Sequence, residues 1–205
     1  MTMTNQQAEA RQQHIVGAPM RVPPLPQDAL GSDVHELVAR IGATLGYEPP
    51  EELTTYFALM AHHPALFRCN IETGIMFFTQ SALPPREREL AVLRTAWLAG
   101  APYEWGEHVD IGRKLDIGPD DTDRVRLGPD APGWSEHERA LLGAVDELVA
   151  NQMISDAVWA SLAQTYSEPQ LIELPALVGQ YFAVAMIQNS LRVPLARESK
   201  GFAER

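Results

Sequence analysis

Residues 86–118 read RERELAVLRTAWLAGAPYEWGEHVDIGRKLDIG and contain the boundary between two expected helices. The proline pair at 84–85 opens the first helix, because proline is tolerated in a first helical turn. Gly100 ends this helix, and acidic side chains gather near its start, as helix ends prefer. Pro102 opens the second helix, which is expected to continue to Gly118. The stretch therefore predicts two consecutive helices joined by a short turn.

The rest of the chain shows the same helical organisation. Ser32 or Asp33 can cap a helix that Gly46 ends, and Pro64 can open another. No segment alternates apolar and polar residues in the manner of a strand, and no Asn-Gly or Asp-Gly hairpin turn is present. The fold class is predicted to be all-α, a compact bundle of about eight helices. These are expected over residues 33–46, 49–63, 64–80, 83–100, 102–118, 139–151, 155–166 and 171–191.

Two of these helices start with capping boxes, in which a serine and a residue three positions later satisfy each other's backbone groups. Ser135 pairs with Glu138, and Ser167 pairs with Gln170. Inside the last helix, Pro175 is expected to produce a kink or a break.

Residues 1–30 differ from the remainder and are predicted to form a proline-rich N-terminal arm, followed by one helical domain over residues 31–205. Prolines 19, 23, 24 and 26 favour an extended path in this segment. Either a disordered tail or an arm that lies across the body or a neighbouring subunit fits this composition.

Charge and cysteine content narrow the possible functions. The 205-residue chain has a net charge of -11, which disfavours binding to nucleic acid. The N-terminus has no apolar signal core, and the apolar runs of about a dozen residues are shorter than a membrane span. We therefore expect a cytoplasmic protein with no nucleic-acid and no membrane partner. Cys69 is alone, so the chain can form no internal disulfide and no Cys-x-x-Cys pair.

Glu89 lies on the same face of its helix as Leu93 and Ala96. A carboxylate in an apolar stripe needs a hydrogen-bonding partner or a raised pKa, because an unpaired buried charge is costly. Arg86, one turn earlier, is a candidate partner for an ordinary surface ion pair. Periodicity by itself favours a structural role for Glu89.

Glu104 and His108 are one turn apart on the next helix, and Ile111 and Leu115 continue their face inward. A carboxylate beside an imidazole raises the pKa of the histidine and orients its ring, which suits acid–base chemistry near neutral pH. A satisfied core histidine would show the same pattern. A metal site is disfavoured, because no HExxH motif and no third ligand are present, and no P-loop or dinucleotide-binding motif occurs.

Residues 86–118 resemble the core of the carboxymuconolactone decarboxylase family, which includes the alkylhydroperoxidase D-like proteins. The resemblance extends over about residues 35–195, and it implies an all-helical fold that assembles into homo-oligomers. In the peroxidase branch a glutamate, a Cys-x-x-Cys pair and a histidine form a proton relay. Glu89 and His108 match the glutamate and the histidine, whereas the two cysteines fall on Ala101 and Glu104. The resemblance therefore argues against a thiol peroxidase, since that cycle needs both thiols.

The decarboxylase branch works without a thiol, and it suggests a cofactor-independent lyase or isomerase acting on a small carboxylated lactone or a related enolisable compound. In this hypothesis His108 is the proton shuttle, Glu89 or Glu104 orients it, and Tyr103 donates to a carbonyl. No cofactor and no metal are expected, and the partners are a small-molecule substrate and further copies of the chain. Gln180 and Tyr181 are weaker candidates for pocket walls, and Trp105 is assigned to packing. The alternative is a non-catalytic helical oligomer that binds a small molecule or a protein partner.

Overall fold

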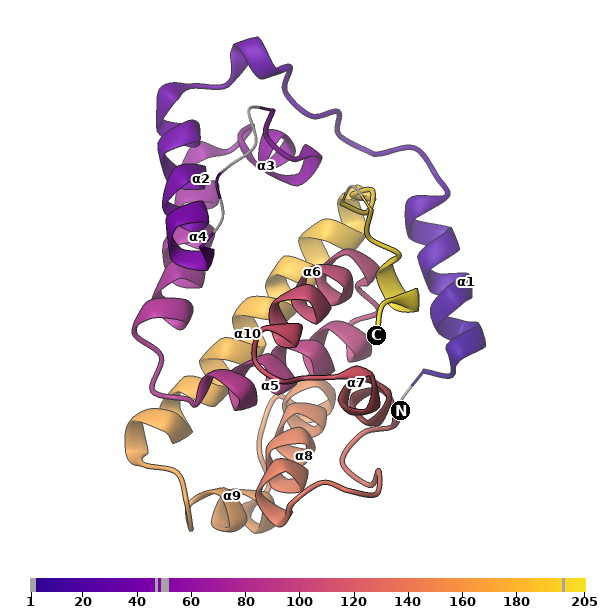
Figure 1. Ribbon diagram of the computed structural model, residues 1–205, viewed down its shortest axis with the longest axis vertical. Helices are drawn as coiled ribbons and strands as arrows, with labels where there is room; N and C mark the ends of the chain where they lie inside the picture. Colours follow the sequence, from indigo (N-terminus) through magenta and orange to yellow (C-terminus); the bar gives the residue numbers. More distant parts are fainter. Residues whose placement is uncertain (1–2, 47, 49–51, 197) are drawn as a thin grey trace.

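The computed structural model describes residues 3–46, 48, 52–196 and 198–205, and this part of the chain is helical without a strand (Figure 1). The predicted all-α class is therefore confirmed. The α-helices are α1 (Asn5–Val16), α2 (Ser32–Leu45), α3 (Thr55–Met60), α4 (Pro64–Thr79), α5 (Pro85–Leu98), α6 (Pro102–Arg113), α7 (Pro119–Leu127), α8 (Glu136–Asn151), α9 (Asp156–Leu162) and α10 (Glu168–Leu191). Two 3-10 turns, η1 (Gln27–Ala29) and η2 (Gly201–Ala203), complete the elements.

The described residues form ten α-helices, where about eight were expected. One extra helix is α1, which a capping box between Thr4 and Gln7 starts inside the predicted arm. The other is α7, because α6 ends at Arg113 and the chain begins a new helix at Pro119 after Gly118. The boundary of the arm at residue 30 stays a prediction.

Most of the expected helix ends are confirmed. Gly46 ends α2 with a left-handed φ of 73°, and both predicted capping boxes, before α8 and α10, are formed. The N-cap of α2 is Gly31 and not Ser32 or Asp33. Helix α10 runs through Pro175 as one helix, so the break expected there is wrong, while the kink that was the alternative stays a prediction. The start expected at residue 49 lies outside the described residues.

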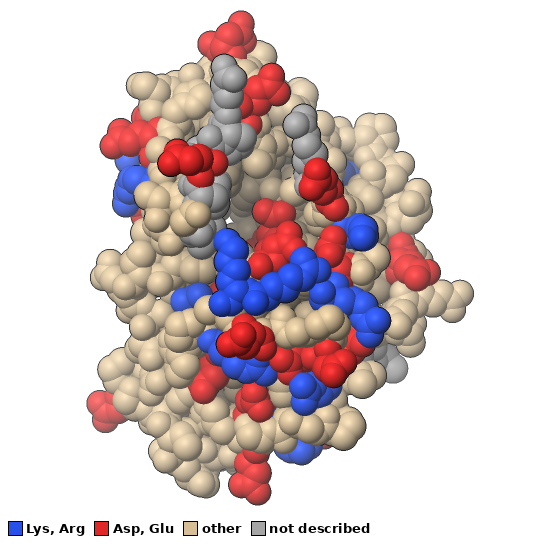
Figure 2. Space-filling view, in the orientation of Figure 1, with Lys and Arg blue, Asp and Glu red and all other residues tan. Residues whose placement is uncertain are grey.

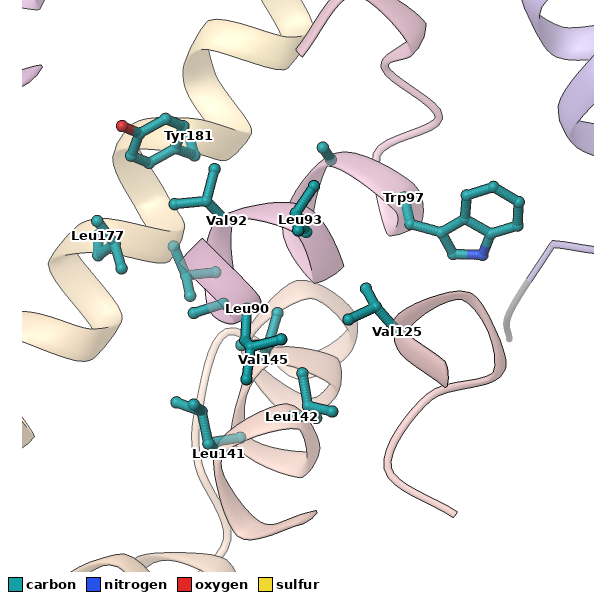
Figure 3. Packing of buried hydrophobic residues seen from close by; sticks show 14 of the residues in the cluster. Leu90, Val92, Leu93, Trp97, Val125, Leu141, Leu142, Val145, Leu177 and Tyr181 are labelled. Carbon is teal, nitrogen blue, oxygen red and sulfur yellow. The ribbon is translucent and has the colours of Figure 1, made fainter. Parts of the chain in front are cut away.

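Helix α5 is the centre of the fold. All residues from Arg88 to Trp97 are buried, and α5 contacts α6, α7, α8 and α10. Figure 3 shows the apolar side chains of α5 pointing in different directions, toward α7, α8 and α10. A helix enclosed on all sides can hold polar side chains only where other residues form hydrogen bonds or ion pairs with them. The polar residues of α5 therefore mark places in the core where such partners are present.

A second, smaller core forms where α2, α3 and α4 pack together, with Leu37, Leu59 and Phe67 among its buried residues. In Figure 1 these helices lie to one side of the group formed by α5, α6, α8 and α10. Tyr103 of α6 and Val193 after α10 belong to this second core and connect the two parts. The arrangement leaves the inward face of α6 between the two cores.

Helix α10 has the length and apolar composition of a membrane span, in contrast to the expectation from the short apolar runs. In this chain it packs against α5 and α8, and its inner side chains, such as Leu174 and Leu177, belong to the main core. These contacts are those of a core helix. Only 33% of the most apolar 18-residue stretch of α10 is buried in the single chain, so the helix has an apolar outer side.

Trp105 is fully buried, which confirms its assignment to packing. Its ring contacts Trp97 and Phe202, and its Nε1–H donates to the carbonyl oxygen of Glu204 at 3.2 Å. The guanidinium of Arg126 lies over both tryptophan rings and also donates to the carbonyl of Phe202. This cluster holds the C-terminal segment against the back of α6.

Candidate functional site

His108 lies between two carboxylates that come from two different helices. Its Nδ1 is 2.7 Å from Oε2 of Glu89 on α5, and its Nε2 is 3.2 Å from Oε1 of Glu104 on its own helix. Glu89 is fully buried, and the other two side chains are almost so. The structure thus brings together three of the four residues predicted for the site, in the order Glu89, His108, Glu104.

Each carboxylate in this row has a further partner. Oε1 of Glu89 accepts from Nε of Arg88 at 3.1 Å, and Oε2 of Glu104 accepts from Nε2 of Gln188 on α10 at 2.6 Å. The expected pairing of Glu89 with Arg86 is wrong, because Arg86 forms ion pairs with Asp121 and Glu138 instead. Arg88 was not predicted as a site residue, although it is adjacent to Glu89 in sequence.

The two carboxylates decide the charge of His108. Burial lowers the pKa of an imidazole, but attraction from Glu89 and hydrogen bonds to Glu104 and Glu89 outweigh burial and raise the pKa of His108 to about 10. At neutral pH the ring is therefore an imidazolium whose two N–H groups face carboxylates. Together with Arg88, the row alternates positive and negative charges.

Aromatic rings enclose this row. Phe78 of α4 stacks on the His108 ring at 6.5 Å, and Tyr181 of α10 meets the same ring edge-on at 4.9 Å. The Arg88 guanidinium lies 4.4 Å from the centre of the Phe78 ring. The ring packing keeps the charges out of bulk water, where their attraction would be weaker.

A cavity of about 550 Å³ opens onto the row from the space between the two cores. Glu104, His108 and Arg88 line one part of it, and Phe78, Tyr56 and Tyr103 are among its aromatic walls. Figure 2 shows a hollow in the surface between α2–α4 and the central helices, with acidic side chains inside it and lysine and arginine side chains along its border. The volume is in the range of small-molecule sites.

Tyr103, the fourth predicted residue, also lines the cavity, and its ring packs against Tyr56 at 5.6 Å. Burial, followed by the nearby Glu107 and Glu104, raises the pKa of Tyr103 well above its ordinary value, while a hydrogen bond with Thr54 lowers it in part. The phenol is therefore neutral. Gln180 and Tyr181, the two weaker candidates, line the same cavity.

Glu107 is a site residue that sequence reasoning missed. It lines the cavity beside Glu104 and His108. Burial, followed by Glu104, raises its pKa to about 7, with His108 acting in the opposite direction. The signal in the sequence was its spacing from Glu104, since residues three apart in a helix are neighbours on its surface. Glu107 is thus a carboxyl that changes charge near neutral pH.

The positions that matched the two cysteines carry no thiol. Ala101 is buried at the start of α6, and Glu104 occupies the second position. Cys69 is exposed on α4 and is not among the cavity-lining residues. Within the described residues, no group of three or more His, Cys, Asp or Glu side chains could hold a metal ion.

Residues 65–147 match the model of the carboxymuconolactone decarboxylase family. A search of curated proteins found no match. Among solved structures, the chain is similar to a peroxidase-related protein from Ralstonia eutropha JMP134 with an alkylhydroperoxidase AhpD core, at a TM-score of 0.73 and 20% identity, covering 88% of this chain and 95% of that one.

The debrominase Bmp8 in complex with 2,3,4-tribromopyrrole is similar at a TM-score of 0.69 and 16% identity, over 87% of this chain and 92% of that one. A peroxidase-related protein from Silicibacter sp. TM1040 is similar at a TM-score of 0.72 and 15% identity, over 89% of this chain and 96% of that one. At these identities the likeness shows the fold. The family match, which covers α5 and α6, and the structural likeness agree with the resemblance read from residues 86–118. Residues 65–147 therefore belong to the carboxymuconolactone decarboxylase family, and the chain as a whole has the all-helical fold of the alkylhydroperoxidase D-like proteins.

Proposed function

We propose that the protein is a cofactor-independent lyase or isomerase that acts on a small carboxylated lactone or a related enolisable compound. One observation carries the proposal: a histidine is held through both ring nitrogens between Glu89 and Glu104 beside a cavity of about 550 Å³. A histidine between two carboxylates can hold a proton and transfer it over a short distance without a metal or a thiol.

The geometry divides the roles differently from the sequence-based hypothesis. Both nitrogens of His108 are engaged, so His108 reaches a ligand through Glu104, which is hydrogen-bonded to Nε2 and lines the cavity. Glu104 is therefore the proposed catalytic acid–base group. His108 supplies and recovers the proton, and Glu89 orients His108 from the other side.

In an isomerisation, Glu104 takes a proton from the carbon next to a carbonyl and returns it to another carbon of the conjugated system. In a decarboxylation, the bond to the carboxylate carbon breaks, carbon dioxide leaves, and its electron pair passes into the conjugated carbonyl. Glu104 then delivers to carbon the proton that it receives from His108, and solvent restores the proton on His108. Tyr103, a neutral phenol at the cavity wall, is the proposed donor to the carbonyl oxygen.

The similar debrominase structure contains a bound ring compound, 2,3,4-tribromopyrrole. This supports the proposal that a protein of this fold binds small planar molecules, although the tribromopyrrole is a ligand of the debrominase and not of this chain. A thiol peroxidase is not proposed, because positions 101 and 104 lack cysteine.

The test is deuterium uptake from D2O into a panel of β,γ-unsaturated γ-lactones, with and without a carboxyl group, followed by proton NMR. We expect enzyme-dependent exchange or loss of carbon dioxide with at least one compound. Glu104→Gln and His108→Gln should each slow it by about 10²-fold or more. Glu72→Gln, a change at a half-exposed carboxylate on α4, is the matched control and should leave the rate unaltered. Exchange that persists at full rate in Glu104→Gln would contradict the proposal.

The alternative function, a binding protein without catalysis, is supported by the size and aromatic lining of the cavity. Ligand binding without any exchange across the panel, together with an unchanged proton state of the ligand, would favour this alternative.

A further inference from the structure

Two residues that line the cavity each carry a buried polar atom with no partner within the described part of the chain. Oε1 of Gln188 and Nδ2 of Asn70 are both buried and unpaired, and both residues line the cavity. Gln188 is 2% exposed, and its Nε2 is bound to Glu104, which leaves its oxygen as an acceptor. A buried polar atom without a partner costs about 1–3 kcal/mol, so a ligand that satisfies it gains affinity.

The charges beside Gln188 are already balanced by one another. Arg88 pairs with Glu89, and His108 lies between Glu89 and Glu104, so the two cations face two carboxylates. Glu107 and Asp110 add carboxyl groups to the lining, and Lys114 adds a cation. An anionic group placed beside Gln188 would meet the carbonyl dipole and the Glu104 carboxylate. A cationic group would lose its hydration next to Arg88 and His108.

The walls near this end suit a flat ligand. Phe78 and Tyr181 contact the His108 ring from two directions, and Tyr56 and Tyr103 form a further aromatic wall. Gly74 of α4 also lines the cavity, and a Cβ at this position would meet no atom within 4 Å. The absence of a side chain at Gly74 thus leaves room against α4 for a ring.

We infer that the inner end of the cavity binds a neutral, planar ring compound through a hydroxyl or ring N–H group, which donates to Oε1 of Gln188. The unpaired Nδ2 of Asn70 donates to a carbonyl or hydroxyl oxygen elsewhere on the same ligand. The inference rests on the proposed function in that both use this cavity. Within the proposed function it selects the uncharged enolisable compounds over the carboxylated lactones, and it places the enol hydroxyl inward.

The test compares four naphthalene probes of one shape by isothermal titration at pH 7. They are 2-naphthol, a neutral donor; 2-methoxynaphthalene, which lacks the donor; 2-naphthoate, an anion; and 2-(aminomethyl)naphthalene, a cation. We expect 2-naphthol to bind about 10-fold or more tightly than each of the other three, as one hydrogen bond to a buried acceptor allows. Gln188→Met should remove the difference between 2-naphthol and 2-methoxynaphthalene.

Gly74→Leu fills the cavity and should weaken every probe, whereas Gly143→Leu on α8, where a Cβ also meets no atom within 4 Å, should leave binding unchanged. Preferred binding of the anion or the cation, equal binding of the two neutral probes, no binding of 2-naphthol, or unaltered binding in Gly74→Leu would each overturn the inference. If Gln188→Met does not fold, the relative affinities of the four probes for the native chain still test the inference. The titration needs no turnover, so its outcome is independent of the deuterium exchange that tests the proposed function.

Discussion

At the residue scale, His108 shows how two carboxylates outweigh burial. Burial alone would favour a neutral ring, but Glu89 and Glu104 contact both nitrogens and raise the pKa of His108 to about 10. The protein therefore keeps a buried imidazolium at the pH where an ordinary histidine is mostly neutral. Proton transfer at this site depends on Glu104, because no nitrogen of His108 is left for a ligand.

The first prediction concerns this charge. Because the pKa of His108 is raised in the folded state, its contribution to the free energy of unfolding is fully present below pH 6.5 and is lost as the pH rises through about 10. The melting temperature should therefore fall between pH 7 and pH 10.5, and less steeply in His108→Gln. Nitrogen-15 NMR should show both ring nitrogens protonated at pH 7.5. A neutral ring at this pH would contradict the assignment.

The second prediction concerns Glu107, whose pKa is raised from 4.5 to about 7. Between these pH values the folded protein holds a proton that the unfolded chain has lost, so stability should fall as the pH rises through 7. Glu107→Gln should remove this slope and stabilise the protein above pH 7 by about 1–2 kcal/mol, less than the full shift implies because the side chain is partly exposed. Urea unfolding at pH 5 and pH 8 measures both effects. A steeper slope in the variant would refute the role assigned to Glu107.

At the scale of the elements, α5 gives the fold its rigidity, because its side chains from Arg88 to Trp97 are buried against four other helices. Leu93→Ala should lower the free energy of unfolding by about 2–5 kcal/mol, since it leaves a cavity in a closely packed core. Leu127→Ala on α7, where the leucine is 66% exposed, is the matched control and should change it by less than about 1 kcal/mol. Equal losses in the two variants would show that α5 is not the centre of the core.

At the scale of the whole molecule, α10 has an apolar outer side in the single chain. Ile172 is 71% exposed and Met186 is 53% exposed, on a helix whose inner side holds the core. Apolar surface of this kind marks an interaction site, and a second copy of the chain is the partner that the sequence analysis predicted.

We therefore predict a homo-oligomer, with a light-scattering mass that is a multiple of 22.7 kDa. Ile172→Glu or Met186→Glu should lower the mass toward that of one chain, while Gln152→Glu, at an exposed polar position after α8, should not. A mass of one chain for the native protein at micromolar concentration would exclude the homo-oligomer.

Much of this protein could be predicted from local sequence. The capping boxes at Ser135 and Ser167, the glycine at position 46 and the prolines at the starts of α4, α5 and α6 act within a few residues, so they indicate helix ends without knowledge of the fold. The spacing of Glu104 and His108 likewise placed them on one helix face. The all-α class and the missing thiols followed from the residues themselves.

Tertiary structure decided which groups meet. Glu89 pairs with Arg88 and His108, and not with Arg86, because the burial of α5 brings Arg88 inward and leaves Arg86 to Asp121 and Glu138. The side chain of Gln188 reaches Glu104 from a helix far along the chain. The pKa of Glu107, the unpaired oxygen of Gln188 and the cavity itself depend on burial and on distances between helices. Local periodicity reports the direction of a side chain on its own helix, whereas burial and contact depend on how the helices pack, and only the folded chain decides that.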